Sequence, residues 1–144
     1  MSMMGITDYG ATGALEATIR FAGQRQRIIA HNIANISTPD FQSLDVSPIA
    51  FQKALSRAVD LRRKAGDSRG LDIPSTRELR KDSSGNLVLR PSTPSGNILG
   101  QDRNNSDIER LMQDQTENLM VYRSSIELLR SRSEMMRSAL ASRV

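Results

Sequence analysis

The longest uninterrupted helical pattern follows Gly100, because the chain has neither glycine nor proline beyond that residue. Apolar residues recur there at alternating spacings of four and three, typical of a helix that packs on another helix along a narrow stripe. The stripe consists of Ile108, Met112, Leu119, Tyr122, Ile126, Leu129, Met136 and Leu140. A helix of about 35 residues is roughly 50 Å long, more than a domain of this size covers with its own core. We therefore predict that part of the stripe contacts another molecule.

A second stripe with the same spacing lies near the N-terminus. It consists of Leu15, Ile19, Ala22, Ile29, Ile33 and Ile36. Because both ends share one period, the two helices can pair. We predict a mainly α fold, with long N- and C-terminal helices pairing as an antiparallel coiled-coil-like inner domain. The expected divisions are 1–45 for the N-terminal helix, 46–100 for a variable and partly disordered middle region, and 101–144 for the C-terminal helix.

The middle region differs in composition, since all five prolines lie between residues 39 and 94. Ser47 and Pro48 suit the N-cap and first turn of a helix, and Gly66 suits its end, so we predict a short helix between them. The segment RELRKDSSGNLVLR, residues 77–90, predicts a small β-hairpin that turns near its Ser-Gly pair.

The sequence offers little of the chemistry that catalysis needs. It contains one histidine, His31, and no cysteine, and its acidic residues form no known metal or phosphate motif. A lone helical histidine is more often a surface or interface residue than a ligand. We therefore expect no enzyme activity and no cofactor.

The charge distribution argues against a nucleic-acid partner. The formal net charge is +4, but residues 1–40 and residues 101–144 are each neutral, so the excess lies entirely in the middle. A short basic cluster without interleaved aromatic residues is usually a solvated surface. The sequence also has no run of about 18 apolar residues and no basic and apolar leader, so we expect neither membrane insertion nor a cleaved signal peptide.

A short motif ends the N-terminal helix. It consists of Asn32, Ile33, Ala34, Asn35, Thr38, Pro39 and Phe41. Proline removes a backbone donor and restricts the residue before it, so the helix must stop here. The motif resembles the NIANxxTPGY signature of the flagellar axial proteins, which are the rod, hook and related subunits of the bacterial flagellum. Asp40 stands where that family usually has glycine. Aspartate is among the few residues that tolerate the left-handed region, so we expect the turn to survive.

The C-terminal segment NNSDIERLMQDQTENLMVYRSSIELLRSR narrows the resemblance to the proximal-rod subunits of this family. The resemblance covers roughly residues 12–45 and 97–144, and the middle matches only loosely. It implies a structural subunit that polymerises through its terminal helices into the periplasm-spanning drive shaft. It also implies that the partners are other copies of the chain, other rod and basal-body subunits, and the flagellar type III export gate. The expected location is the periplasmic rod of the basal body.

Two further expectations concern single positions. Early rod and hook subunits present a Phe-x-x-x-hydrophobic segment to the export gate, and Phe51 and Leu55 match it; the alternative is that they form the apolar face of the short helix. Asn32 and Asn35 are candidates for fixing the register of the terminal helix against neighbouring subunits; the alternative is a helix cap.

Two other functions remain open from the sequence. A cytoplasmic helical adaptor or chaperone would offer the same stripes to one partner. A basic nucleic-acid binder would show binding that weakens steeply with salt.

Overall fold

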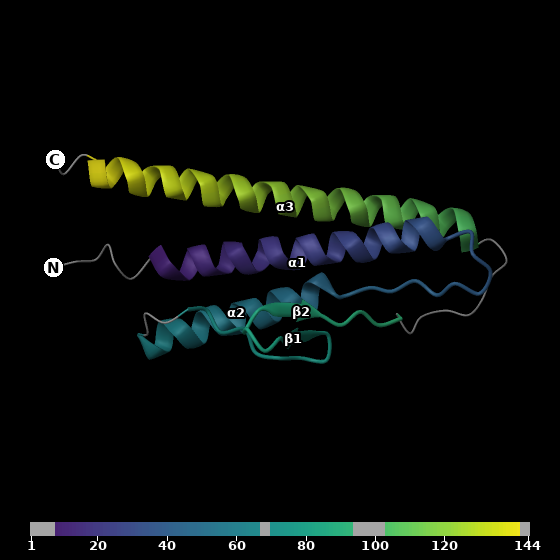
Figure 1. Ribbon diagram of the computed structural model, residues 1–144, viewed down its shortest axis with the longest axis horizontal. Helices are drawn as coiled ribbons and strands as arrows, with labels where there is room; N and C mark the ends of the chain where they lie inside the picture. Colours follow the sequence, from purple (N-terminus) through teal and green to yellow (C-terminus); the bar gives the residue numbers. More distant parts are fainter. Residues whose placement is uncertain (1–7, 67–69, 94–102, 142–144) are drawn as a thin grey trace.

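The computed structural model describes residues 8–66, 70–93 and 103–141 of the chain. In chain order these residues form α1 (Asp8–Asn35), α2 (Pro48–Ala65), β1 (Leu79–Lys81), β2 (Leu87–Leu89) and α3 (Arg103–Ala141). α1 lies in the middle, with α3 along one side of it and α2 and the hairpin along the other (Figure 1). α1 and α3 run in opposite directions, which confirms the predicted antiparallel pairing and mainly α fold.

α2 begins and ends where the sequence indicates. The Ser47 hydroxyl accepts a hydrogen bond from the backbone N–H of Ala50 at 3.2 Å, and Pro48 occupies the first turn, where its missing donor costs nothing. Gly66 follows the helix at φ 60°, in the left-handed conformation that glycine adopts without penalty. Both end signals of the predicted short helix are confirmed.

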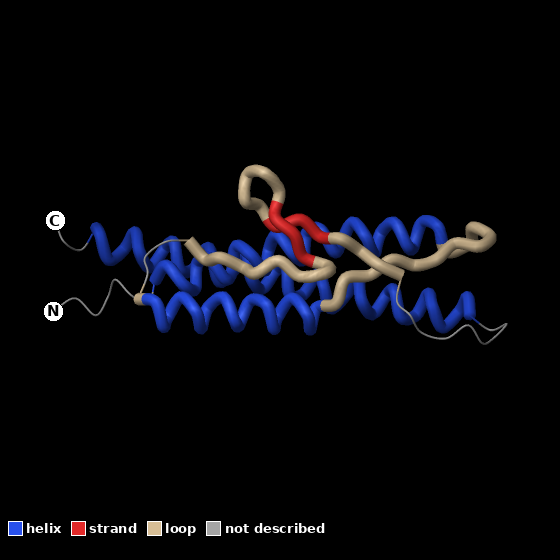
Figure 2. The backbone as a smooth tube through the Cα atoms, turned by 90° about the horizontal axis from the view of Figure 1, so that it is seen from below, coloured by secondary structure: helices blue, strands red, loops and turns tan. Residues whose placement is uncertain are grey.

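The hairpin is also confirmed, with Leu79 opposite Leu89 in an antiparallel register. In the view from below, its turn projects past the helices (Figure 2). Gln24 of α1 fixes it in place, because its side-chain amide donates to the Leu87 carbonyl at 2.7 Å and accepts from the Leu89 N–H at 3.0 Å. One side chain thus satisfies two backbone groups of β2.

The hydrophobic core lies between α1, α2 and the hairpin. Its buried members are Ala17, Phe21, Val46, Phe51, Ala54, Ala58, Ile73, Leu79 and Leu89. The rings of Phe21 and Phe51 stack at its centre, with centroids 4.1 Å apart and planes 8° from parallel. α3 adds a single buried apolar residue among those described, Leu111. α1, α2 and the hairpin therefore form one packed unit, and α3 packs on the outside of that unit.

The hairpin turn depends on Asp82. Its Oδ1 accepts hydrogen bonds from the backbone N–H groups of Ser84 and Asn86, each at 2.8 Å. The bond from Asn86 is the main reason that the pKa of this carboxyl lies below its ordinary value of 3.8. A carboxyl group whose pKa is lower in the folded chain than in the unfolded chain stabilises the fold at pH values above its unfolded pKa. That contribution is lost as the pH falls through the folded pKa.

We expect the Asp82 carboxyl to titrate below pH 3.8 in the folded chain, because the turn stabilises its ionised form. Carboxyl chemical shifts followed by NMR during an acid titration would measure the midpoint. Asp82→Asn provides the control spectrum that assigns the signal. A midpoint at or above 3.8 would contradict this account of the turn.

Candidate assembly interface

The face of α3 that packs on α1 is partly polar. The buried residues of this face recur every seven positions and are Leu111, Asn118 and Ser125. The Asn118 side-chain amide donates to the Ala22 carbonyl at 2.9 Å and to the Gln26 amide oxygen at 2.8 Å. Polar groups buried between paired helices are satisfied in only one alignment, so they specify the register. We call this packed face the α1–α3 seam.

Arg25 of α1 carries a buried charge at the edge of the seam. Only 4% of this residue is exposed. Its Nε lies 3.2 Å from Oδ1 of Asp45, in the segment between α1 and α2, and its Nη2 lies 3.1 Å from Oδ1 of Asp114 on α3. A buried guanidinium is tolerated only when its partners are in place. The pairing therefore ties three separate segments together.

Asn32 holds the chain that leaves α1. This residue is 2% exposed, and its amide donates to the Leu44 carbonyl at 2.6 Å while its oxygen accepts from the Leu44 N–H at 3.0 Å. The two bonds satisfy both backbone groups of one residue, as a neighbouring strand would. Asn32 therefore turns the outgoing chain back along α1 towards α2.

The helix stop itself is a compact turn. The Thr38 N–H donates to the Asn35 carbonyl at 2.9 Å, and the Phe41 N–H donates to the Thr38 carbonyl at 3.2 Å. Asp40 lies at φ 58°, so the expected left-handed conformation at this position is confirmed. The Asn35 side-chain amide donates to the His31 carbonyl at 2.8 Å, within the last turn of α1.

His31 lies on the exposed side of this turn. Its ring meets Phe41 edge to face, with centroids 5.6 Å apart. Within residues 8–66, 70–93 and 103–141, no three histidine, aspartate or glutamate side chains gather as metal ligands would. In the same parts of the chain, no helix is both long and apolar enough to cross a membrane.

The predicted stripe of α3 coincides only in part with the face that packs on α1. The seam runs through residues 111, 118 and 125, each one position before Met112, Leu119 and Ile126 of the stripe. Tyr122, Ile126 and Leu129 lie at the border of the seam and are half-buried. The remaining members of the stripe are exposed, namely Ile108, Met112, Leu119, Met136 and Leu140. Tyr122 and Leu129 follow Asn118 and Ser125 by four residues, about one helical turn, so the predicted stripe and the packed face share one border.

On α1 the predicted stripe lies closer to the seam. Ala22 and Ile29 are buried. The other members are half-buried, namely Leu15, Ile19, Ile33 and Ile36. Neighbouring segments cover α1 on more than one side, which explains why its stripe is better covered than that of α3.

Comparison with known proteins gives one consistent result, although no family model matches the chain. The flagellar basal body rod protein FlgB of Borrelia hermsii is 36% identical over 104 residues, which cover 68% of this chain and 71% of that protein. The chain belongs to the FlgB family. FlgB of Yersinia enterocolitica is 27% identical over 136 residues, and FlgB of Bacillus subtilis strain 168 is 27% identical over 132 residues. Each of these two alignments covers 91% of this chain and 93% of the relative.

In this FlgB-family chain, the motif residues have intrachain roles. Asn32 bonds to the backbone of Leu44, Asn35 bonds to the His31 carbonyl, and Phe41 contacts His31. Ile33 is half-buried, and Ala34, Thr38 and Pro39 are exposed. A contact between Asn35 and a neighbouring subunit stays a prediction.

Sequence reasoning did not find the Arg25 pairing. One signal was present, because Arg25 lies directly beside Gln26, which occupies the stripe position between Ala22 and Ile29. A charge at such a position suggests a buried pair. Its partners, Asp45 and Asp114, lie 20 and 89 residues away, and no local pattern identifies them.

We expect Asn32→Ala to lower the free energy of unfolding by about 1–3 kcal/mol, because it leaves two backbone groups of Leu44 without partners. Asn35→Ala is the matched control, since the same change removes contacts with His31 alone at an exposed turn and should alter stability by about 0.5 kcal/mol or less. Urea denaturation followed by circular dichroism would measure both. Equal losses would contradict the role given to Asn32.

Proposed function

We propose that this chain is a structural subunit of the flagellar proximal rod, and that copies of it polymerise through α1 and α3 into the drive shaft that spans the periplasm. Its partners are then other copies of itself and other rod and basal-body subunits. The curated relatives support the proposal, since each is named a flagellar basal body rod protein.

The observation that carries the proposal is the attachment of α3. This helix buries a narrow, partly polar face against α1 and leaves large apolar side chains exposed along much of its length. Monomeric soluble proteins rarely expose extended apolar surface, and such surface marks contacts with other proteins. Subunits that stack by contacts between different faces form open helical assemblies.

The C-terminal end of α3 also exposes apolar side chains. Asn118 lies beside Ala22 and Asp114 beside Arg25, so the antiparallel register brings Arg132 near Asp8, the first described residue of α1. Met136 and Leu140 lie beyond that point, and both are exposed. Their exposed apolar side chains are suited to contact a neighbouring subunit.

Deletion of the gene tests the proposal directly. We expect cells without it to lose flagellar filaments and motility, and a plasmid copy to restore both. Immunodetection of the chain in purified basal bodies would locate it. Cells that keep rotating flagella after the deletion would rule out the rod function and favour an adaptor or chaperone, which would instead form a stable complex with one cytoplasmic partner.

We also propose that the chain is exported unfolded through the flagellar type III gate, with Phe51 and Leu55 as the segment that the gate reads. In the folded chain Phe51 is 3% exposed and stacks on Phe21, and Leu55 is half-buried. The segment is therefore accessible only before folding, which agrees with reading during export. The core role of Phe51 makes a stability control necessary.

Phe51→Ala should strongly reduce secretion of a tagged chain, and Phe21→Ala should not. Each substitution removes one ring of the same stacked pair and costs about 3–5 kcal/mol of stability, but only Phe51 lies in the proposed segment. Comparing tagged chain in the culture medium and in cell extracts measures the difference. Equal secretion by the two variants would leave Phe51 with its core role alone.

A further inference from the structure

Every methionine among the described residues lies on α3 and is exposed. Met112 and Met136 are each 47% exposed, and Met120 and Met135 are each 63% exposed. The remaining three methionines of the chain, at positions 1, 3 and 4, lie outside the described residues. Methionine is normally among the residues that fill a protein core, but the described core of this chain contains none. The four methionines of α3 therefore belong to its surface.

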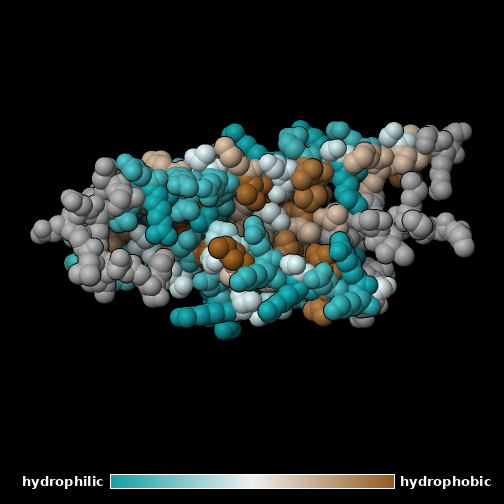
Figure 3. All heavy atoms as spheres, turned by 180° about the vertical axis from the view of Figure 1, so that it is seen from behind, coloured by the Kyte–Doolittle hydropathy of each residue, from teal (hydrophilic) through white to brown (hydrophobic). Residues whose placement is uncertain are grey.

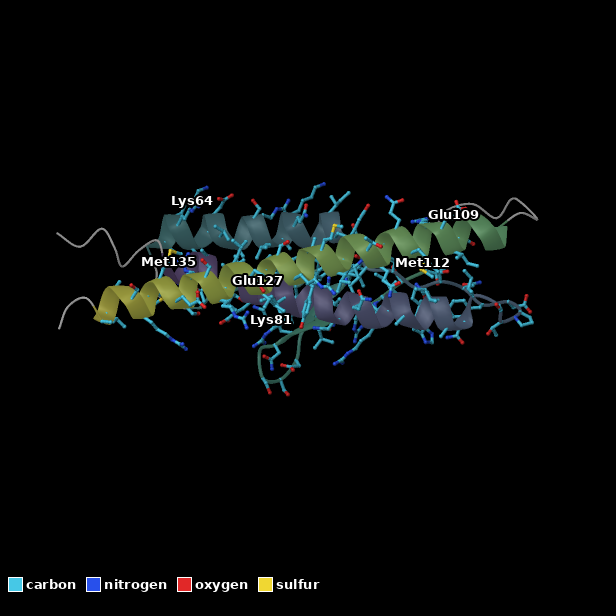
Figure 4. All side chains as sticks on the ribbon, turned by 90° about the horizontal axis from the view of Figure 1, so that it is seen from above. Lys64, Lys81, Glu109, Met112, Glu127 and Met135 are labelled. Carbon is cyan, nitrogen blue, oxygen red and sulfur yellow. The ribbon has the colours of Figure 1, made fainter. Side chains whose placement is uncertain are left out.

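These methionines are spread around the exposed side of α3. In the view from behind, hydrophobic side chains reach the molecular surface among hydrophilic ones (Figure 3). Met120 follows Met112 by eight residues, about 80° beyond two full helical turns, and Met135 follows Met120 by fifteen residues, about 60° beyond four turns. Met112 points towards the hairpin side of the molecule, where Lys81 lies, whereas Met135 points towards the α2 side (Figure 4). A subunit that packs on the exposed side of α3 therefore contacts at least one methionine.

Methionine also supplies much of the exposed apolar surface of α3. Four of the nine large apolar side chains that this helix exposes are methionines, and the other five are Ile108, Leu119, Val121, Leu128 and Leu140. The proposed contacts of α3 with other subunits depend on the apolar character of these nine side chains. A change that made the methionines polar would remove a large part of that character.

Oxidation by hydrogen peroxide makes that change. One oxygen atom passes from the peroxide to the thioether sulfur, the O–O bond breaks, and the products are methionine sulfoxide and water. The sulfur is oxidised by two electrons and the peroxide is reduced. Because the sulfoxide is polar, the oxidised side chain no longer favours an apolar contact. The chain contains no cysteine that would react in place of the methionines.

The fold does not depend on these four side chains. α3 is held to α1 through Leu111, through the hydrogen bonds of Asn118 and through the pairing of Arg25 with Asp114. The hydrophobic core lies on the other side of α1, against α2 and the hairpin (Figure 1). Oxidation of the methionines therefore changes the surface of α3 and leaves the α1–α3 seam and the core in place.

From these observations we propose that the four methionines of α3 are a redox-sensitive modification site. Peroxide converts the apolar surface of a free copy into a more polar one and so blocks its incorporation into the rod. Methionine sulfoxide reductases restore the thioether, so the block is reversible. This inference rests on the proposed rod function and adds its regulation.

The first test uses the purified full chain treated with hydrogen peroxide. Peptide mass spectrometry should find one added oxygen at each of Met112, Met120, Met135 and Met136, and circular dichroism should retain the helical signal. Fluorescence of the dye ANS, which binds exposed apolar surface, should fall on oxidation and recover after treatment with methionine sulfoxide reductases. A loss of helical signal on oxidation, or unchanged dye fluorescence, would overturn the inference.

Two matched variants test the consequence in cells that lack the natural gene. The first carries Met112→Gln, Met120→Gln, Met135→Gln and Met136→Gln, and the second carries leucine at the same four positions. Glutamine is polar like the sulfoxide, leucine stays apolar without the sulfur, and both have a helix propensity close to that of methionine. The glutamine variant should enter basal bodies about tenfold less, because losing one buried methionine contact weakens an association by about that factor or more. The leucine variant should enter them as the wild-type chain does.

The outcomes separate this inference from the rod function. If the wild-type chain enters basal bodies and the two variants do so equally, the inference is overturned and the rod function stands. A glutamine variant that loses its helical signal in circular dichroism would also overturn it, because the four side chains would then support the fold. A wild-type chain that is absent from basal bodies would remove both proposals.

Discussion

The arrangement of this chain depends on one buried charge. The guanidinium of Arg25 lies between α1, the segment that follows it and α3, and it interacts with Asp45 and Asp114. Burying an ion is costly unless its partners are held at close range, so the three segments must come together in one way. Asp45 extends the network, because its backbone pairs with Ser92 after the hairpin.

Two side-chain amides of α1 add to this constraint. Gln24 satisfies two backbone groups of β2, and Asn32 satisfies two of Leu44. α1 therefore holds the hairpin and the outgoing chain by hydrogen bonds that have few alternative partners, while the apolar core beneath supplies non-directional attraction. The helix acts as the scaffold on which the remaining segments are aligned.

The polar nature of the α1–α3 seam has a functional consequence. An apolar seam would have buried the methionines and leucines of α3 within the chain. Because Asn118 and Ser125 occupy the seam instead, the large apolar side chains of α3 stay exposed on both flanks of the helix. The proposed rod contacts use this surface, and the separate core between α1, α2 and the hairpin lets each copy keep its fold without them.

The sequence by itself determined the elements of this protein. Periodicity predicted α1 and α3, Ser47 with Pro48 and Gly66 bounded α2, and the Ser-Gly pair located the hairpin, because each signal acts within a few residues along the chain. The end of α1 at Thr38 and Pro39 was equally determined, since proline restricts its neighbours by covalent geometry. The motif at that end indicated the flagellar axial proteins, and the C-terminal segment narrowed the resemblance to proximal-rod subunits.

Only the tertiary structure decided which face of α3 meets α1. Spacing alone indicated the more apolar stripe through Met112 and Leu119, but the packed face runs one residue earlier, through Leu111 and Asn118. The partners that favour this face, Ala22, Gln26 and Arg25, lie about ninety residues away in the sequence. Directional hydrogen bonds and a buried charge require particular atoms at particular distances, and those distances exist only once the chain is folded.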